Sequence, residues 1–401
     1  MRLSACVLAV AVLSPFAARA QTPPEGAPPA APPPPPAAPP PPAVVVVAPP
    51  PPAAPAAPPA KTWKDLITID GLVDTYYQWN FTGSTSLTST APAGSVAVRS
   101  FDINSNTFTL NYAKVGIGVN PEPVGLRLDL GYGATGALIN AANPSDASSD
   151  PFLVEQAYAT IVPVTNLTLD FGKFVTTAGS EVIEANKNWL YSRSILFFNI
   201  PLLHTGFRAT YKVSDALTLQ GSVINGWNGV GIAPDITKDK TFGVSANITV
   251  PGVGTNIIAT GYFGKGEATG AATASTDTRL LADLVVAQTF GPLGLNLNFD
   301  YVTDKAANID GFTGVAIMGH YTVSDHLSAT ARFEYARNGD PTHIKLIEGT
   351  VGLGVGLGGR FEFRPEVRVD NASVPDFDPD GTGGFKDKTQ VTATGAFLAW
   401  F

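Results

Sequence analysis

The feature that most constrains this chain is a repeated stretch of about ten residues in which apolar and polar side chains alternate. The stretches recur from residue 65 onward, and the turns between them alternate between very short and long. Short turns rich in Gly, Pro, Asn and Asp fall at 120–123, 163–166, 214–215, 251–254, 291–294, 324–325 and 358–359, and long connections fall at 81–103, 137–150, 176–203, 227–240, 265–277, 304–311, 338–341 and 371–386. Such alternation predicts an all-β fold: a transmembrane antiparallel β-barrel of about 16 strands, with short periplasmic turns and longer external loops.

Within single strands the alternation separates the two faces by chemistry. In 293–301 Leu, Phe and Tyr fall on one side and Asn and Asp on the other, and in 360–370 six ionisable residues alternate with Phe, Pro and Val. A half-buried strand of a soluble sandwich also alternates, but it needs no such apolar opposite face in nearly every segment. No run approaches the ~20 apolar residues of a membrane helix, so the sequence favours strands that face lipid.

The N-terminal residues predict export followed by a spacer. Residues 1–20 combine Arg2, an apolar run and a small-residue site before Gln21, as a cleavable signal peptide does. Residues 21–61 are rich in Pro and Ala, and 23–60 are almost wholly so apart from a run of four Val, a composition that favours solvated polyproline II. We expect a disordered periplasmic tether there, either a plain spacer or a segment that binds the cell wall, and the barrel over 62–401.

Cysteine usage and charge exclude several classes of protein. Cys6 is the only cysteine and lies in the predicted signal peptide, so the mature chain has no disulfide and no thiolate ligand. The formal net charge of −8 argues against nucleic acid as a partner. Burial and backbone pairing must therefore hold the mature protein together.

The last predicted strand ends on an aromatic residue. In 391–401 apolar and small residues occupy alternate positions, and Phe401 is the final residue. This ending resembles the terminal segment that outer-membrane barrels offer to their assembly machinery. We therefore expect the bacterial outer membrane as the location, with lipid and the barrel-assembly machinery as partners, and both termini on the periplasmic side.

A barrel of about 16 strands is wide enough for an aqueous channel, whereas eight strands would be filled by side chains. Arginines at inward-facing positions are expected to line this pore, where rings of charge set selectivity and Arg favours anions. These residues are Arg127, Arg208, Arg332, Arg360, Arg364 and Arg368. An alternative interpretation pairs the arginines with neighbouring carboxylates that stiffen the wall, and both can hold at once.

The longest central loop, 176–203, is too apolar to move freely in water. We expect it to pack against the inner wall and narrow the channel, which places Glu181, Glu184, Lys187 and Arg193 across the pore. Alternatively, the loop caps the barrel from outside or packs against a neighbouring subunit.

The same loop carries a family resemblance. The segments 181–185, 188–194 and 204–208, with Pro201 between them, resemble the signature of the OmpL-like β-barrel porin family of bacterial outer membranes. The organisation of the chain is similar over about residues 65–401. The resemblance implies an outer-membrane pore, without a named substrate and without functional residues to transfer.

An enzyme built on a barrel is the rival class. His326 and Ser328 share one strand face and resemble the His-x-Ser arrangement of the outer-membrane phospholipase, but the sequence identifies neither an orienting group nor an oxyanion site. The other histidines show no metal spacing, and the acidic stretch 376–381 lacks the ligand series of an EF-hand. The glycine-rich stretch 352–356 is followed by no helix, so it makes room for the inward loop instead of holding phosphate. We expect no catalytic, cofactor or metal site.

The sequence thus predicts a porin that gives passive diffusion of small hydrophilic solutes or ions through a water-filled barrel. The alternative is a plugged barrel that acts as an anchor or adhesin and links the outer membrane to the cell wall through the Pro/Ala tether. Large porins resembling this chain often form trimers, so a homotrimer is one expected assembly. The solute, the sign of any charge selectivity and the state of the lumen stay open at this point.

Overall fold

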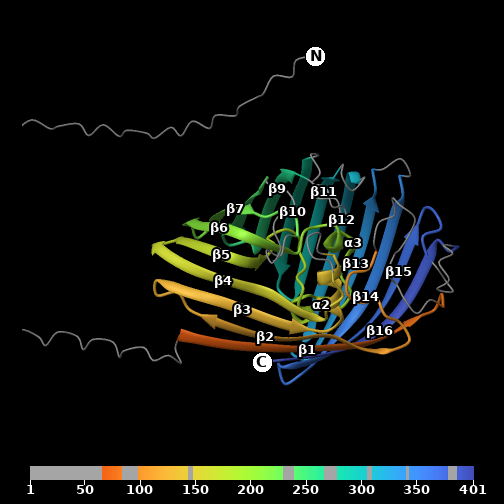
Figure 1. Cartoon of the computed structure of the whole chain (residues 1–401). Coiled ribbons are helices and arrows are strands. Elements are labelled where there is room, and N and C mark those ends of the chain that lie inside the picture. Colours follow the sequence, from red (N-terminus) through yellow and green to blue (C-terminus); the bar gives the residue numbers. More distant parts are fainter. Residues whose placement is uncertain are drawn as a thin grey trace, which may run out of the picture. The chain divides into compact units, whose positions relative to one another are not determined.

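The computed structural model describes residues 66–83, 98–142, 148–228, 239–265, 278–304, 309–339, 343–377 and 386–401. Within these residues, sixteen strands form one closed barrel in which every neighbouring pair is antiparallel (Figure 1). The strands are β1 (Ile67–Asn80), β2 (Phe108–Val119), β3 (Val124–Tyr132), β4 (Phe152–Val164), β5 (Leu167–Val175), β6 (Leu203–Ser214), β7 (Leu217–Ile224), β8 (Thr241–Val250), β9 (Thr255–Lys265), β10 (Thr278–Phe290), β11 (Leu293–Asp304), β12 (Ile309–Ser324), β13 (Leu327–Arg337), β14 (Lys345–Leu357), β15 (Phe361–Ala372) and β16 (Thr389–Trp400). The predicted fold class is confirmed.

The barrel closes where β1 pairs with β16 (Figure 1). In that pair Leu72 lies opposite Trp400. Beyond the end of β16, the amide of Phe401 donates to the carbonyl of Gly71 at 3.1 Å, and the amide of Gly71 donates back at 3.2 Å. The ring of Phe401 covers Gly71 so closely that a β-carbon there would lie 2.4 Å from a ring carbon. The last residue of the chain therefore takes part in closing the barrel.

The two faces of the wall differ as the alternation predicts. On β15 the inward-facing Arg364, Glu366 and Arg368 are buried, whereas the outward-facing Val367 and Val369 are 45% and 41% exposed. Large exposed apolar side chains recur on strands around the described barrel. Since a soluble protein rarely leaves so much contiguous apolar surface in water, the outer face is built for lipid.

The connections follow the predicted alternation of short and long. Tight turns join β6 to β7, β12 to β13 and the other predicted pairs, and long connections join the remaining neighbours. In the described part of the chain, three short helical segments were not predicted: α2 (Ala134–Ala141), η1 (Ala185–Lys187) and α3 (Ile195–Phe198). Among the described residues, no helix has the length and apolar character needed to cross a membrane.

Segments from the long connections pack inside the barrel. Residues 98–105 follow β1, α2 follows β3, and residues 176–202 join β5 to β6. Their apolar side chains form a buried cluster with the wall, in which the rings of Phe101 and Phe197 meet edge to face at 5.7 Å. The interior is therefore partly filled. The predicted signal peptide at 1–20 and the predicted tether at 21–61 lie outside the described residues.

Candidate functional site

The connection from β5 to β6, residues 176–202, is here named the inner loop. It packs against the inward face of the wall: α3 contacts β12 and β13, and η1 contacts β16. Two inward-facing glycines make room for it, because a β-carbon on Gly314 would lie 2.6 Å from the side chain of Leu196, and one on Gly352 would lie 2.8 Å from that of Leu190. The clearance expected of the stretch 352–356 is thus confirmed at Gly352.

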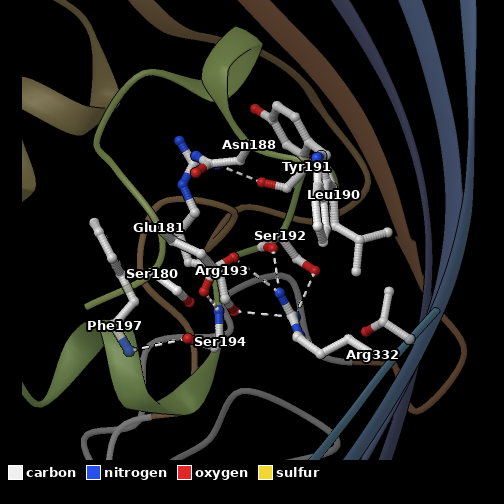
Figure 2. Close-up of polar contacts among 12 residues, drawn as sticks. Ser180, Glu181, Asn188, Leu190, Tyr191, Ser192, Arg193, Ser194, Phe197 and Arg332 are labelled. Atoms are coloured by element: carbon white, nitrogen blue, oxygen red, sulfur yellow. Dashed lines mark hydrogen bonds and ion pairs between the residues drawn. The ribbon is translucent and has the colours of Figure 1, made fainter. Parts of the chain in front are cut away.

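Arg332 on β13 makes the densest set of contacts with the inner loop (Figure 2). Its guanidinium donates to the Ser192 carbonyl at 2.7 Å and the Arg193 carbonyl at 3.2 Å, and forms an ion pair with Glu181 at 3.2 Å. On the wall it pairs with Glu334 at 3.0 Å and Glu348 at 3.2 Å. The five donors of one arginine thus join the loop to two strands.

Wall carboxylates accept hydrogen bonds from the loop backbone. Glu366 on β15 accepts from the amides of Tyr191 at 2.9 Å and Ser192 at 3.1 Å. Glu334 accepts from the amide of Ile195 at 2.9 Å, at the first residue of α3. Backbone groups that would otherwise be buried without partners are satisfied by carboxyl oxygens, so this segment of the loop is held by its main chain.

Two arginines of β15 hold carbonyl groups of the interior segments. Arg364 donates to the carbonyl of Ala185 at 2.6 Å, and Arg368 donates to those of Arg193 and Val98, each at 2.6 Å. Arg368 therefore ties the inner loop to the segment that follows β1. Both guanidinium groups are engaged with protein groups, which leaves little of their charge for a solute.

Arg193 of the inner loop is directed into the loop itself (Figure 2). It donates to the carbonyls of Val182 at 3.1 Å, Ile183 and Tyr191, and its guanidinium lies 5.4 Å from the centre of the Phe101 ring. Arg193 is 1% exposed. Its role in this arrangement is to hold the loop in shape.

Glu184 and Lys187 form the most open charged contact of the inner loop. The Lys187 amine is 2.8 Å from a Glu184 oxygen, and its side chain is 57% exposed. Glu184 also binds Lys114 of β2 at 2.5 Å, and Lys114 binds Glu155 at 3.0 Å. Burial opposes ionisation of Glu184, but the two lysines outweigh it and hold its pKa at about 2. Lys187 is thus the predicted loop residue that presents charge to open space.

The remaining predicted pore arginines have different surroundings. Arg127 of β3 pairs with Asp70 at 2.6 Å and with Asp129 at 2.7 Å. Arg208 of β6 pairs with Asp170 at 2.9 Å. Arg360 is exposed in the turn before β15, so it does not lie on the wall. The ion-pair interpretation therefore describes Arg127 and Arg208 better than a free positive ring does.

Sequence reasoning missed a second anchor of the inner loop on β1 and β2. The side-chain amide of Asn111 donates to a carboxylate oxygen of Asp74 and to the hydroxyl of Tyr191, both at 2.9 Å. The ring of Tyr76 meets that of Tyr191 at 5.4 Å between centres. Polar residues at alternate positions of β1 were the available signal for an inward face, but nothing in the sequence paired them with the loop.

Open space remains on one side of the inner loop. A cavity of about 400 Å³, here named the central cavity, lies between the loop and β7, β8 and β9. A second cavity of about 420 Å³, here named the turn-side cavity, lies between the loop and the ends of β12 to β15 near their short turns. Lys187 lines both cavities. The two cavities therefore meet at this lysine.

A larger hollow of about 900 Å³ lies on the outer face of β12 to β16 and β1. Its walls are apolar or small outward-facing groups such as Ala331, Phe363 and Gly395. Because it faces the lipid side and offers almost no polar surface, we do not assign it to solute passage.

The His326 and Ser328 pair, considered for an enzyme, lines the turn-side cavity. His326 is exposed in the turn between β12 and β13, and Ser328 follows on β13. Within the described part of the chain, no group of three or more His, Cys, Asp or Glu side chains converges as metal ligands would.

Several solved outer-membrane barrels have the same fold as this chain. The channel DcaP of Acinetobacter baumannii gives a TM-score of 0.55 at 13% identity over 84% of this chain and 97% of that one. OprB of Pseudomonas putida gives 0.56 at 12% identity over 84% and 95%. OmpT of Vibrio cholerae in its trimer form gives 0.54 at 12% identity over 84% and 99%. At such identities the likeness shows the fold alone.

The family assignment rests on the sequence match. No curated protein matches the chain. The family model described as "Putative beta-barrel porin-2, OmpL-like" matches residues 66–401, the whole of the described barrel. Family and fold point to a channel of the bacterial outer membrane and not to an enzyme. With that match over most of its length, the chain belongs to the OmpL-like β-barrel porin family.

Proposed function

We propose that this protein is an outer-membrane porin through which small hydrophilic solutes diffuse passively, and that the inner loop narrows its pore. The observation that carries the proposal is the position of open space. The inner loop is bound to β13, β15, β1 and β2, and the central cavity remains between the loop and the opposite wall. A loop fixed to one side of a wide barrel leaves a narrow passage on the other side.

The central cavity fits a route along the barrel, because its lining runs from Val175 and Leu202, at the long-connection ends of β5 and β6, toward the short turns. The central cavity reaches Thr218 and Asn247, which lie beside short turns, and the turn-side cavity reaches the turn between β12 and β13. Lys187 lies at their junction, so a solute that moves between them passes its amine. We therefore propose Lys187, with Glu184 beside it, as the charged pair at the constriction, whereas Glu181 and Arg193 hold the loop in place.

The test is single-channel conductance of the folded protein in a planar bilayer, together with deletion of residues 181–195. Steady openings, with a larger conductance in the deletion variant, support the proposal. Folded barrels that pass no current would instead favour the plugged barrel, a structural anchor or adhesin, and an unchanged conductance in the deletion variant would contradict narrowing by the loop.

Two further proposals concern assembly and attachment. A homotrimer is supported by the trimer form of the similar Vibrio cholerae barrel, and the mass of the protein in detergent, measured by light scattering, tests it. The tether at 21–61 is proposed to link the barrel to the periplasm or the cell wall. Loss of cell-wall attachment on removal of 23–60, with an unchanged barrel, is the expected result.

A further inference from the structure

The lumen is electrically asymmetric along the barrel wall. Of the described residues of β7, β8 and β9, only Lys265, the last residue of β9, carries a charge. On the inward face of β15, by contrast, Glu362, Arg364, Glu366 and Arg368 follow one another. The inner loop covers the charged side, and the central cavity lies against the uncharged side.

The side chains that form the uncharged side are here named the neutral wall: Thr218, Gln220, Ser245, Asn247 and Ile258, all of which line the central cavity. Gln220, Ser245 and Asn247 hydrogen-bond to neighbouring uncharged side chains. The Gln220 amide donates to the Thr210 hydroxyl at 3.1 Å, and the Asn256 amide donates to Asn247 at 2.6 Å. Hydroxyl and amide groups both donate and accept, so a solute rich in hydroxyl groups can take over such bonds.

The charges that border the central cavity are already engaged. On its loop side, Glu181 and Glu184 are 5% and 6% exposed and pair with Arg332 and Lys114. Beside the neutral wall, Arg208 of β6 is paired with Asp170.

On the other flanks, Asp283 of β10 is 4% exposed, and Lys212 of β6 pairs with Asp215 at the short-turn rim. Lys187, Arg208 and Lys212 thus each have a carboxylate partner, and Asp283 is buried, so these groups offer an entering ion no exposed charge without an opposite charge beside it.

We propose that the passage selects small uncharged polyhydroxylated solutes, such as monosaccharides and polyols, over ions of either sign, because its open side is the neutral wall. This inference rests on the proposed pore function and names its substrate class. Charged solutes lose hydration in a narrow cavity without a compensating partner, whereas neutral hydroxylated solutes exchange water for the hydroxyl and amide groups of the wall.

The experiment compares three pyranose solutes of similar size and shape: glucose, glucosamine as a cation and glucuronate as an anion. Radiolabelled tracers leave proteoliposomes with equal salt on both sides, so no net current limits the flux. The expected result is that glucose leaves at least about tenfold faster than either ion, a difference worth about 1.4 kcal/mol in barrier height. Equal rates, or a faster ion, would overturn the inference while leaving the pore intact.

Retention of all three tracers by folded barrels is the separate outcome that rejects the pore itself, and this inference with it. The variant Gln220→Glu keeps the size of the side chain, and the Thr210 hydroxyl can turn to donate to the new carboxylate. It should raise glucosamine flux relative to glucose and lower that of glucuronate. Asn247→Asp, which keeps its acceptor oxygen for Asn256, is a second variant should the first fail to fold.

A matched control places the same charge away from the cavity. Asn371 lies at the exposed end of β15, where its side-chain amide donates to the Thr389 hydroxyl, and the control variant is Asn371→Asp. It should leave the flux ratios of the three tracers unchanged. A shift in the ratios as large as that of Gln220→Glu would show that overall charge, and not the neutral wall, sets the selectivity.

Discussion

Replacing Arg332 with Met should release the inner loop. In the folded protein the guanidinium neutralises Glu181, Glu334 and Glu348, and it holds the carbonyls of Ser192 and Arg193. Removing one partner of a buried ion pair costs about 3–5 kcal/mol, because the remaining charges stay buried without compensation. Most of this cost destabilises the docked state of the loop relative to the undocked state, because undocking lets the carboxylates reach water.

Converted to populations, this cost raises the ratio of undocked to docked loop by roughly 150- to 5,000-fold. The assay is single-channel recording, in which the undocked loop appears as time spent in a larger conductance. Arg332→Met should therefore occupy the larger conductance far more often than the wild type. Arg332→Lys keeps the charge but loses the planar fork of donors, so we expect an intermediate occupancy.

Arg127→Met provides a matched control. Arg127 also points inward from the wall and also neutralises two carboxylates, Asp70 and Asp129, but both partners lie on strands. Its loss should leave the conductance states nearly as in the wild type. The reasoning is refuted if folded Arg332→Met, verified by heat modifiability in gel electrophoresis, shows wild-type conductance, or if both arginine variants open the pore alike.

Two further predictions concern pH and assembly. Because Glu184 has a pKa of about 2 in the docked loop against 4.5 ordinarily, its stabilisation of docking is complete above pH 4.5 and is lost as the pH falls toward 2. Larger conductance states should become more frequent over that window, and Glu184→Gln should abolish this part of the pH dependence; openings that increase with rising pH would contradict the sign. Phe401→Ala should reduce the amount of folded barrel in the outer membrane to less than half, whereas Phe290→Ala, which truncates an exposed aromatic at the end of β10, should not, as judged by membrane fractionation.

The strands and their order were predictable because their signals are local. Turn residues and two-residue alternation mark where each strand starts and ends and which side chains share a face. Arg360 shows the limit of this signal: it has the same parity as Arg364 and Arg368, but the chain is still turning there, so the side chain never reaches the wall. An even or odd position in the sequence therefore predicts the face of a side chain only within the strand itself.

The contacts of the inner loop were not predictable from the sequence. Arg332 and Ser192 are 140 residues apart, and alternation cannot say at what height in the barrel a loop meets a side chain. The helix α2 was not predicted because its local signals are weak: it lacks a side-chain cap and contains Gly136. Packing of Ile139 and its neighbours against the wall holds it in place. Such elements depend on tertiary contacts more than on local propensity.

The most direct test of the account asks which side of the lumen carries the solute. The only native cysteine, Cys6, lies in the predicted signal peptide, so single cysteines can be placed at Gln220 on the neutral wall and at Thr350, which is 1% exposed on β14. A membrane-impermeant thiol reagent applied during single-channel recording should reduce the conductance of Gln220→Cys and leave that of Thr350→Cys unchanged. Block at position 350 without block at position 220 would contradict the account, because the passage would then follow the side that the inner loop covers.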